Sequence, residues 1–304
     1  MTCDLANPIF TDEAKATEHM EADRWPNGVN CPHCGSFNVH KMAGQTQAGM
    51  FLCNDCREKF TVRTGTIFER SHIPLHKWLL ATHLMAASKK GMSALQISRM
   101  LGLPYKSAWF LCHRIRESMK PTGTAPIGGT NKVVESDETF IGGKAKNRAY
   151  AKKEPKKHTV LTLVERNGKP IVSYRQRQSQ NASRKDCHMV SRKSHLMTDE
   201  LASYEKVGKE FANYGSVNHS ADEYVRLGGF VHVNTAECRF SLMKRAVFGT
   251  HHSISEAHLP RYLAEWDFKW NTRNITDGER AALALKGAEG RRLTYHGPDR
   301  AAHA

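Results

Sequence analysis

The sequence predicts a multidomain protein in which a small β-ribbon is followed by an all-α segment of three helices and by an α/β domain with a mixed sheet. Three observations predict this order: two close cysteine pairs near the N-terminus, a helical pattern of apolar residues over 75–119, and β-rich runs after a linker rich in Gly, Pro and Thr. The 304 residues are enough for two or three small domains, since one domain takes roughly 100–200 residues. We expect the segments to be 1–24 (an acidic leader), 25–70 (the ribbon), 71–120 (the helices), 121–130 (the linker), 131–275 (the α/β domain) and 276–304 (a C-terminal tail).

The charge of the chain indicates a polyanionic partner. There are 45 Lys and Arg against 30 Asp and Glu, a formal net charge of +15, and nucleic acid is the commonest partner of such a basic protein. The longest nearly apolar run, residues 78–87, is far shorter than the ~20 residues that span a bilayer. The acidic first 25 residues differ from the basic start of a targeting peptide. We therefore expect a cytoplasmic protein that binds nucleic acid and no membrane.

Four cysteines have the spacing of a zinc site. Cys31 and Cys34 form one pair, Cys53 and Cys56 form the other, and 18 residues separate the pairs. This spacing is typical of a tetrahedral zinc ribbon, and short β-rich runs over 39–41, 50–52 and 60–63 fit it. Two disulfides are the alternative, which a reducing cytosol disfavours. We predict one structural Zn²⁺, which supplies much of the folding free energy of so small a segment.

The next segment has the pattern of a helix-turn-helix. Helices are predicted over 75–88, 94–101 and 105–119, with Ser93 as an N-cap and a turn at 102–104. In the third helix apolar residues recur at i, i+3, i+4, i+7 and i+11. A helix, a glycine turn and a second helix with basic residues are typical of a DNA reader, although a plain three-helix bundle would show the same stripe. The candidate DNA-contacting residues are Lys106, Ser107, His113, Arg114 and Arg116.

Three carboxylates occur at the strands and helix of the predicted α/β domain. Asp137 lies in the β-rich run 133–141, Asp199 follows the short strand 195–198, and Glu237 leads into a helix. Lys244 is two helical turns after Glu237, on the same face. Carboxylate oxygens are ligands that Mg²⁺ prefers, and two such ions about 4 Å apart support phosphoryl chemistry. The alternative is that these acids are ordinary surface groups.

Several motifs resemble a known family. They include Ser136 to Lys144, Val217 to Ser220, and Asn234 to Glu237. Through these motifs the chain resembles the ISXO-type insertion-sequence transposases, and the resemblance extends from about residue 25 to about residue 295.

This resemblance implies a ribonuclease-H-like catalytic domain in which Asp137, Asp199 and Glu237 hold two Mg²⁺ or Mn²⁺ ions and Lys244 contacts the DNA end. It also implies a DDE transposase that binds the element ends, cleaves a phosphodiester bond there and joins the freed 3′-hydroxyl to target DNA. The implied partners are both DNAs and further copies of the chain, as a homo-oligomer on DNA.

One stretch departs from the family. Arg175 to Met189 has almost no apolar periodicity, where the family has a strand end and an amphipathic segment. A frameshifted patch and a natural loop variant both explain this departure. A damaged domain would make the protein an inactive relic that only binds DNA. A third possibility is a ribonuclease-H-like nuclease that acts on other nucleic acids, but a nonspecific nuclease needs neither a ribbon nor a helical reader.

Overall fold

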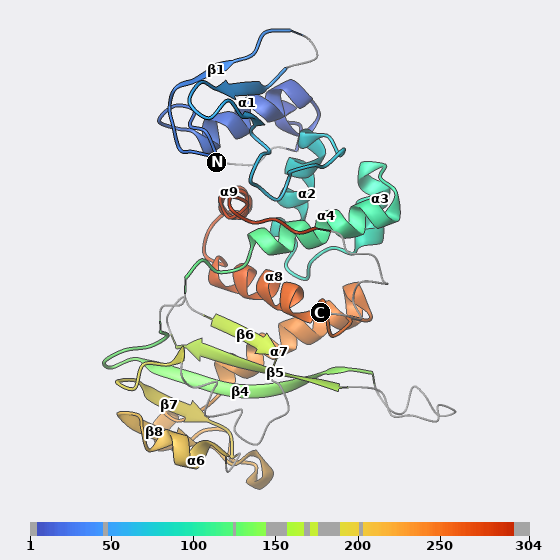
Figure 1. The fold of residues 1–304 in the computed structure, drawn as a ribbon. Coiled ribbons are helices and arrows are strands. Elements are labelled where there is room, and N and C mark those ends of the chain that lie inside the picture. The colour runs from blue at the N-terminus through green and yellow to red at the C-terminus, as the bar shows by residue number, and fades with distance from the viewer. Residues whose placement is uncertain are drawn as a thin grey trace, which may run out of the picture. The chain divides into compact units, whose positions relative to one another are not determined.

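The computed structural model describes residues 5–44, 48–123, 126–143, 157–166, 171–175, 189–200 and 203–294 (Figure 1), with the backbone alone over 171–175. The chain divides into two compact units. One contains Met1–Lys120 together with Ile275–Ala304, and the other contains Pro121–Asn274. Among the described residues, no helix is both long enough and apolar enough to span a membrane.

The first unit begins with a short 3-10 helix and a capped α-helix. The 3-10 helix η1 is Pro8–Phe10 and α1 is Glu13–Arg24. The carboxylate of Asp12 accepts hydrogen bonds from the backbone N–H groups of Ala14 and Lys15, as an N-cap residue does. Asp12 therefore fixes where α1 starts.

The ribbon is a three-stranded antiparallel sheet. Its strands are β1 (Val39–Lys41), β2 (Met50–Cys53) and β3 (Lys59–Thr61), in the order β1-β2-β3. Phe51 and Phe60 stack at a ring-centroid distance of 5.5 Å, and Trp25 packs edge-on against both rings. This aromatic cluster is small, so much of the stability of the ribbon must come from its cysteines.

The helices of this unit lie where the sequence predicts them. They are α2 (Leu75–Ala87), α3 (Ala94–Leu101) and α4 (Tyr105–Ser118). The hydroxyl of Ser93 accepts a hydrogen bond from the backbone N–H of Gln96 at the start of α3. Gly102 ends α3 in the left-handed conformation, with φ 60°, which glycine adopts without strain.

Helix α9 (Asp277–Lys286) and the residues that follow it to Gly290 are part of the first unit and not a tail. This helix packs against α2 and α4, and the guanidinium of buried Arg280 donates to the carbonyl of Ala86. Thr66 and Glu289 form a β-bridge. The expectation of a tail over 276–304 is therefore corrected for α9 and Glu289, whereas residues 295–304 lie outside the described residues. The partner of α9 lies about 190 residues earlier in the chain, and local periodicity does not reveal such a contact.

The second unit contains a mixed five-stranded sheet in the order β6-β5-β4-β7-β8. Neighbouring strands are antiparallel from β6 to β4 and parallel from β4 to β8. The mixed sheet is consistent with a ribonuclease-H-like domain. The strands are β4 (Val133–Gly142), β5 (Lys157–Glu165), β6 (Ile171–Arg175), β7 (His195–Thr198) and β8 (Asn213–Ser216).

Helices cover both faces of this sheet. Figure 1 shows α7 and α8 along one side and α6 beside β7 and β8. Leu161 and Leu163 of β5 pack in one core with Tyr204 of α6, whereas Val160 packs in another with Phe240 of α7. Successive side chains of a strand point to opposite faces, so this unit has one core on each face. The helices are α6 (Ser203–Gly208), η5 (His219–Ala221), η6 (Leu227–Gly229), α7 (Asn234–Ala246), the π-helix η7 (Val247–His251) and α8 (Leu259–Asn271).

Candidate zinc centre, DNA surface and carboxylate site

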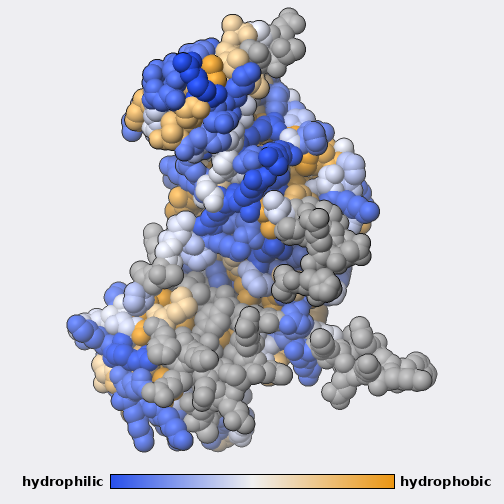
Figure 2. Space-filling view, in the orientation of Figure 1, coloured by the Kyte–Doolittle hydropathy of each residue, from blue (hydrophilic) through white to orange (hydrophobic). Residues whose placement is uncertain are grey.

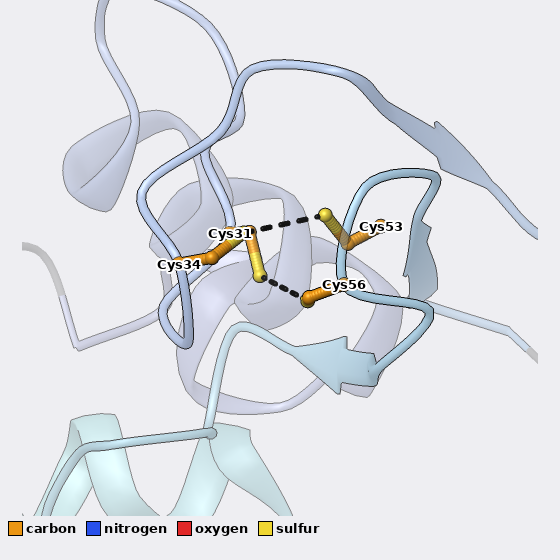
Figure 3. A group of neighbouring side chains, drawn as sticks. All are labelled: Cys31, Cys34, Cys53 and Cys56. Atoms are coloured by element: carbon orange, nitrogen blue, oxygen red, sulfur yellow. Dashed lines mark hydrogen bonds between the residues drawn. The ribbon is translucent and has the colours of Figure 1, made fainter.

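The four cysteines of the ribbon form a cluster that fits a structural zinc ion (Figure 3). The Sγ atoms of Cys31 and Cys56 are 3.7 Å apart, those of Cys34 and Cys53 are 3.6 Å apart, and all four lie within 4.8 Å of one another. A tetrahedron of sulfurs at about 2.3 Å from a zinc ion has edges of about 3.8 Å. These separations are far longer than the ~2.05 Å bond of a disulfide, so the disulfide alternative does not describe this cluster.

Two similar turns present these cysteines. The backbone N–H of Gly35 donates to the carbonyl of Cys31, and that of Arg57 donates to the carbonyl of Cys53. Gly35 and Arg57, each four residues after the first cysteine of its pair, have φ of 79° and 62°. Each pair therefore lies on a tight turn whose end reverses the chain and aims both sulfurs inward.

Three of the residues expected to contact DNA are buried. His113, Arg114 and Arg116 of α4 are almost fully inaccessible, which corrects their assignment to a DNA-facing surface. The guanidinium of Arg114 donates to the carbonyl of Glu69 at 2.7 Å and lies 5.4 Å from the ring centre of Trp78. Burial lowers the pKa of Arg114 to about 10. These side chains are internal because α4 packs against α2, α3 and α9.

The start of α4 is accessible instead. Lys106 is exposed and Ser107 is half-buried, so these two candidates keep a surface position. Tyr105 is exposed beside them, as is Arg99 of α3; we had not predicted either residue. Figure 2 shows apolar residues (orange) among hydrophilic ones (blue) at the surface over α3. The accessible face of the helix-turn-helix candidate is therefore the end of α3 with the first turn of α4.

The three carboxylates lie at one end of the mixed sheet, near enough for the charges of Asp199 and Glu237 to act on Asp137. Ser136 of β4 lies opposite Thr198 of β7 in parallel register, so Asp137 and Asp199 follow at matching positions. Glu237 is in the first turn of α7, which packs against β4. Asp137 is only 9% exposed. Burial raises its pKa to about 7, and the charges of Asp199, Glu237 and Glu138 act in the same direction.

These acids provide only oxygen ligands, a set that suits a hard divalent cation. They are less closely gathered than the zinc ligands: of the residues that the structure describes, only the four cysteines bring their ligand atoms close enough to hold one ion. Lys244 is exposed on α7, two turns after Glu237. The exposed Glu237, Ser241 and Lys244 form a stripe along this helix.

Comparison with known proteins identifies the family. Residues 128–271 match the ISXO2-like transposase domain, and residues 11–59 match the transposase zinc-ribbon domain. The chain belongs to the ISXO2-like transposases. A Halobacterium salinarum protein named as an uncharacterized protein in transposable element ISH50 is 26% identical over 279 residues, which are 86% of this chain and 91% of that protein. Membership of this family implies a transposase function and therefore a DNA partner.

Two further residues of this transposase lie beside the carboxylates. Nε2 of His219 is 3.7 Å from Oε1 of Glu237, and the next residue, Ser220, donates its backbone N–H and its hydroxyl to the carboxylate of Glu200. The loop that carries His219 and Ser220 therefore contacts both Glu200, which follows Asp199 in the chain, and Glu237 at the start of α7. In the sequence this loop is visible only as a family motif, because nothing local shows which carboxylate a histidine will face.

Two stretches of the sequence lie largely outside the described residues: the departure at Arg175–Met189 and a basic stretch from Lys144 to Lys157. Of Arg175–Met189, the structure describes Arg175 as the end of β6 and Met189, which packs against the core on the α6 face. Of the basic stretch from Lys144 to Lys157, only Lys157 is described, at the start of β5.

Proposed function

We propose that this transposase binds the ends of its element, cleaves a phosphodiester bond there with the help of divalent metal ions, and joins the freed 3′-hydroxyl to target DNA. The observation that carries the proposal is the approach of Asp137, Asp199 and Glu237 at one end of the mixed sheet, where their charges act on one another. Most surface acids are dispersed, and a set of like charges beside a buried carboxylate is typical of a functional site.

In this proposal Asp137 and Asp199 hold the Mg²⁺ or Mn²⁺ ions and Glu237 completes their ligands. When bound, such ions polarise the phosphate and stabilise the leaving oxygen. Asp137 provides a carboxylate on a rigid central strand, which keeps its position fixed. Lys244 binds a phosphate of the DNA end, because it is exposed on the same stripe of α7 as Glu237.

We further propose that α3, the turn at 102–104 and α4 form a helix-turn-helix that reads the element ends. A recognition helix contacts bases with its N-terminal residues, and these are the accessible residues of α4. Lys106 and Ser107 contact DNA in this arrangement, with Tyr105 and Arg99 beside them. Cleavage takes place in the cytoplasm, and a homo-oligomer on DNA holds both ends of the element together.

A donor-plasmid assay tests the whole proposal. The purified protein is incubated with a supercoiled plasmid that carries the element ends, in Mg²⁺ or Mn²⁺. We expect 3′-hydroxyl ends at the element boundary and joined products with target DNA. Protein that binds the ends but yields neither product would favour the alternative of an inactive DNA-binding relic, for which the sequence departure at Arg175–Met189 is the observation.

A further inference from the structure

A buried glutamate connects the strand of Asp137 to the helix of Glu237. Glu135 of β4 is completely buried. Its carboxylate accepts hydrogen bonds from the backbone N–H groups of Thr235 (2.8 Å) and Ala236 (3.1 Å) and from the hydroxyl of Thr235 (2.9 Å). These N–H groups belong to the first turn of α7, where helical N–H groups lack partners within the helix. Glu135 therefore caps α7 from a strand that is 100 residues away in the chain.

An arginine holds this carboxylate and the chain that enters the helix. Nε of Arg166 donates to Glu135 at 2.9 Å, and its two terminal nitrogens donate to the carbonyls of Phe230 and His232. Burial, together with the charge of Arg166, lowers the pKa of His232. The neutral ring of His232 can then accept the backbone N–H of Asn234, so the entry to α7 is held at several points.

Geometry makes this contact relevant to the carboxylate site. Glu135 and Asp137 are two residues apart on one strand and so point to the same face of the sheet. Thr235 and Glu237 are two residues apart in the first turn of α7. The hydrogen bonds from Thr235 and Ala236 to Glu135 therefore fix the first turn of α7, which carries Glu237, against the strand that carries Asp137.

We propose that Glu135, supported by Arg166, is a positioning residue that holds Glu237 in place to share a divalent ion with Asp137. This proposal rests on the proposed function, since it presumes the metal site. Residues that orient metal ligands typically change metal affinity about 10- to 100-fold when replaced. A residue with only a structural role changes stability and leaves the affinity of the folded protein unaltered.

The test is Mn²⁺ binding to the full-length, zinc-loaded protein, measured by calorimetry in the absence of DNA. We expect Glu135→Gln to raise the dissociation constant for Mn²⁺ about tenfold or more, with binding to element-end DNA unchanged. The matched control is Glu265→Gln. Glu265 is another completely buried glutamate, which pairs with Lys269 of the same helix, and its replacement should lower stability without altering Mn²⁺ affinity.

Two outcomes separate failure of this proposal from failure of the proposed function. If Asp137→Asn binds Mn²⁺ as the unchanged protein does, the metal site itself is wrong. If Asp137→Asn loses Mn²⁺ while folded Glu135→Gln keeps the original affinity, only the positioning role is overturned. If Glu135→Gln does not fold, the variant Thr235→Val tests the positioning role instead. It removes the hydroxyl contact but keeps both backbone N–H groups, so we expect it to weaken Mn²⁺ binding by less than the roughly tenfold expected of Glu135→Gln. An unaltered affinity overturns the role.

Discussion

At the scale of single residues, alternation along β4 separates neighbouring acids that look equivalent in the sequence. Glu135 and Asp137 share the face covered by α7, whereas Glu138 accepts a hydrogen bond from the hydroxyl of Tyr204, on the α6 side, at 3.0 Å. Side chains at odd and even positions of a strand point to opposite faces. Asp137 is therefore a candidate metal ligand, whereas Glu138 is hydrogen-bonded to Tyr204 on the opposite face of the sheet.

Replacement of the three candidate ligands should abolish cleavage. Asp137→Asn, Asp199→Asn and Glu237→Gln keep the shape of each side chain but remove its charge. We expect each to lower cleavage about a thousandfold, the factor that corresponds to several kcal/mol of lost charge stabilisation. Binding to the element ends should remain, and the donor-plasmid assay measures both properties.

Glu138→Gln is the control for these variants and should change cleavage little. Lys244→Ala should reduce cleavage less completely than the ligand variants, since it loses a phosphate contact and not a metal ligand. Normal cleavage by Glu237→Gln would contradict the assignment of the third ligand.

The buried arginine of α4 gives a prediction about stability. Arg114→Ala removes the hydrogen bond to Glu69 and the contact with Trp78, so we expect it to destabilise the first unit by about 2 kcal/mol. Lys106→Ala, on the exposed start of α4, should instead weaken DNA binding without a change in melting temperature. Thermal denaturation and a salt series of DNA binding measure the two effects. A stable Arg114→Ala protein with weakened DNA binding would restore the DNA-facing role of Arg114.

At the scale of elements, the ribbon is a fold with only a small apolar core. Its three strands have three or four residues each, and one aromatic cluster lies beside them. Two turns with left-handed residues at Gly35 and Arg57 present four sulfurs at the separation that a tetrahedral zinc ion requires. The metal therefore takes the place of a core.

Removal of zinc should unfold the ribbon. We expect about one equivalent of zinc per chain after purification under reducing conditions. Its loss by chelation, or the replacement Cys53→Ser, should unfold residues 25–70, because binding supplies about 10–16 kcal/mol in such sites. Metal analysis and limited proteolysis measure the two effects. A ribbon that stays folded with no zinc bound would disprove the structural role.

At the scale of the whole molecule, the two units do not follow the order of the sequence. The first unit includes α9 from the end of the chain, and the second unit is the segment between. Ala284 of α9 is completely buried, and the carbonyl of Ala288 accepts a hydrogen bond from the backbone N–H of Ile67. Helices α2 and α4 of the first unit thus pack against residues that come after the candidate carboxylates in the chain.

A fragment that ends at residue 120 should therefore be less stable than the same fragment fused through a short linker to residues 275–294. Loss of α9 exposes apolar surface of α2 and α4, and burial of such surface contributes about 25 cal/mol per Å². Circular dichroism melts of the two fragments compare their stabilities, and their affinities for end DNA can be measured at the same time. Equal melting temperatures would show that α9 is dispensable.

The sequence by itself determined the features that are encoded locally. The zinc ligands follow from two short spacings, and α3 follows from its Ser93 cap and Gly102 stop, because caps and turns act within a few residues. The alternation of side chains along a strand is also a local rule, and it predicts that Glu138 points to the opposite face from Asp137. The family resemblance located the candidate catalytic residues through motifs.

Only the tertiary structure decided which faces became internal and which distant residues met. The apolar stripe of α4 predicted one buried face, but α9 lies against this helix too, and His113, Arg114 and Arg116 of α4 became internal. The contact of Glu135 with Thr235 and the approach of His219 to Glu237 also join segments far apart in the chain. Such contacts depend on how strands and helices pack against one another. A periodic pattern of apolar residues predicts that one face of an element is buried, but it does not predict which other element covers that face.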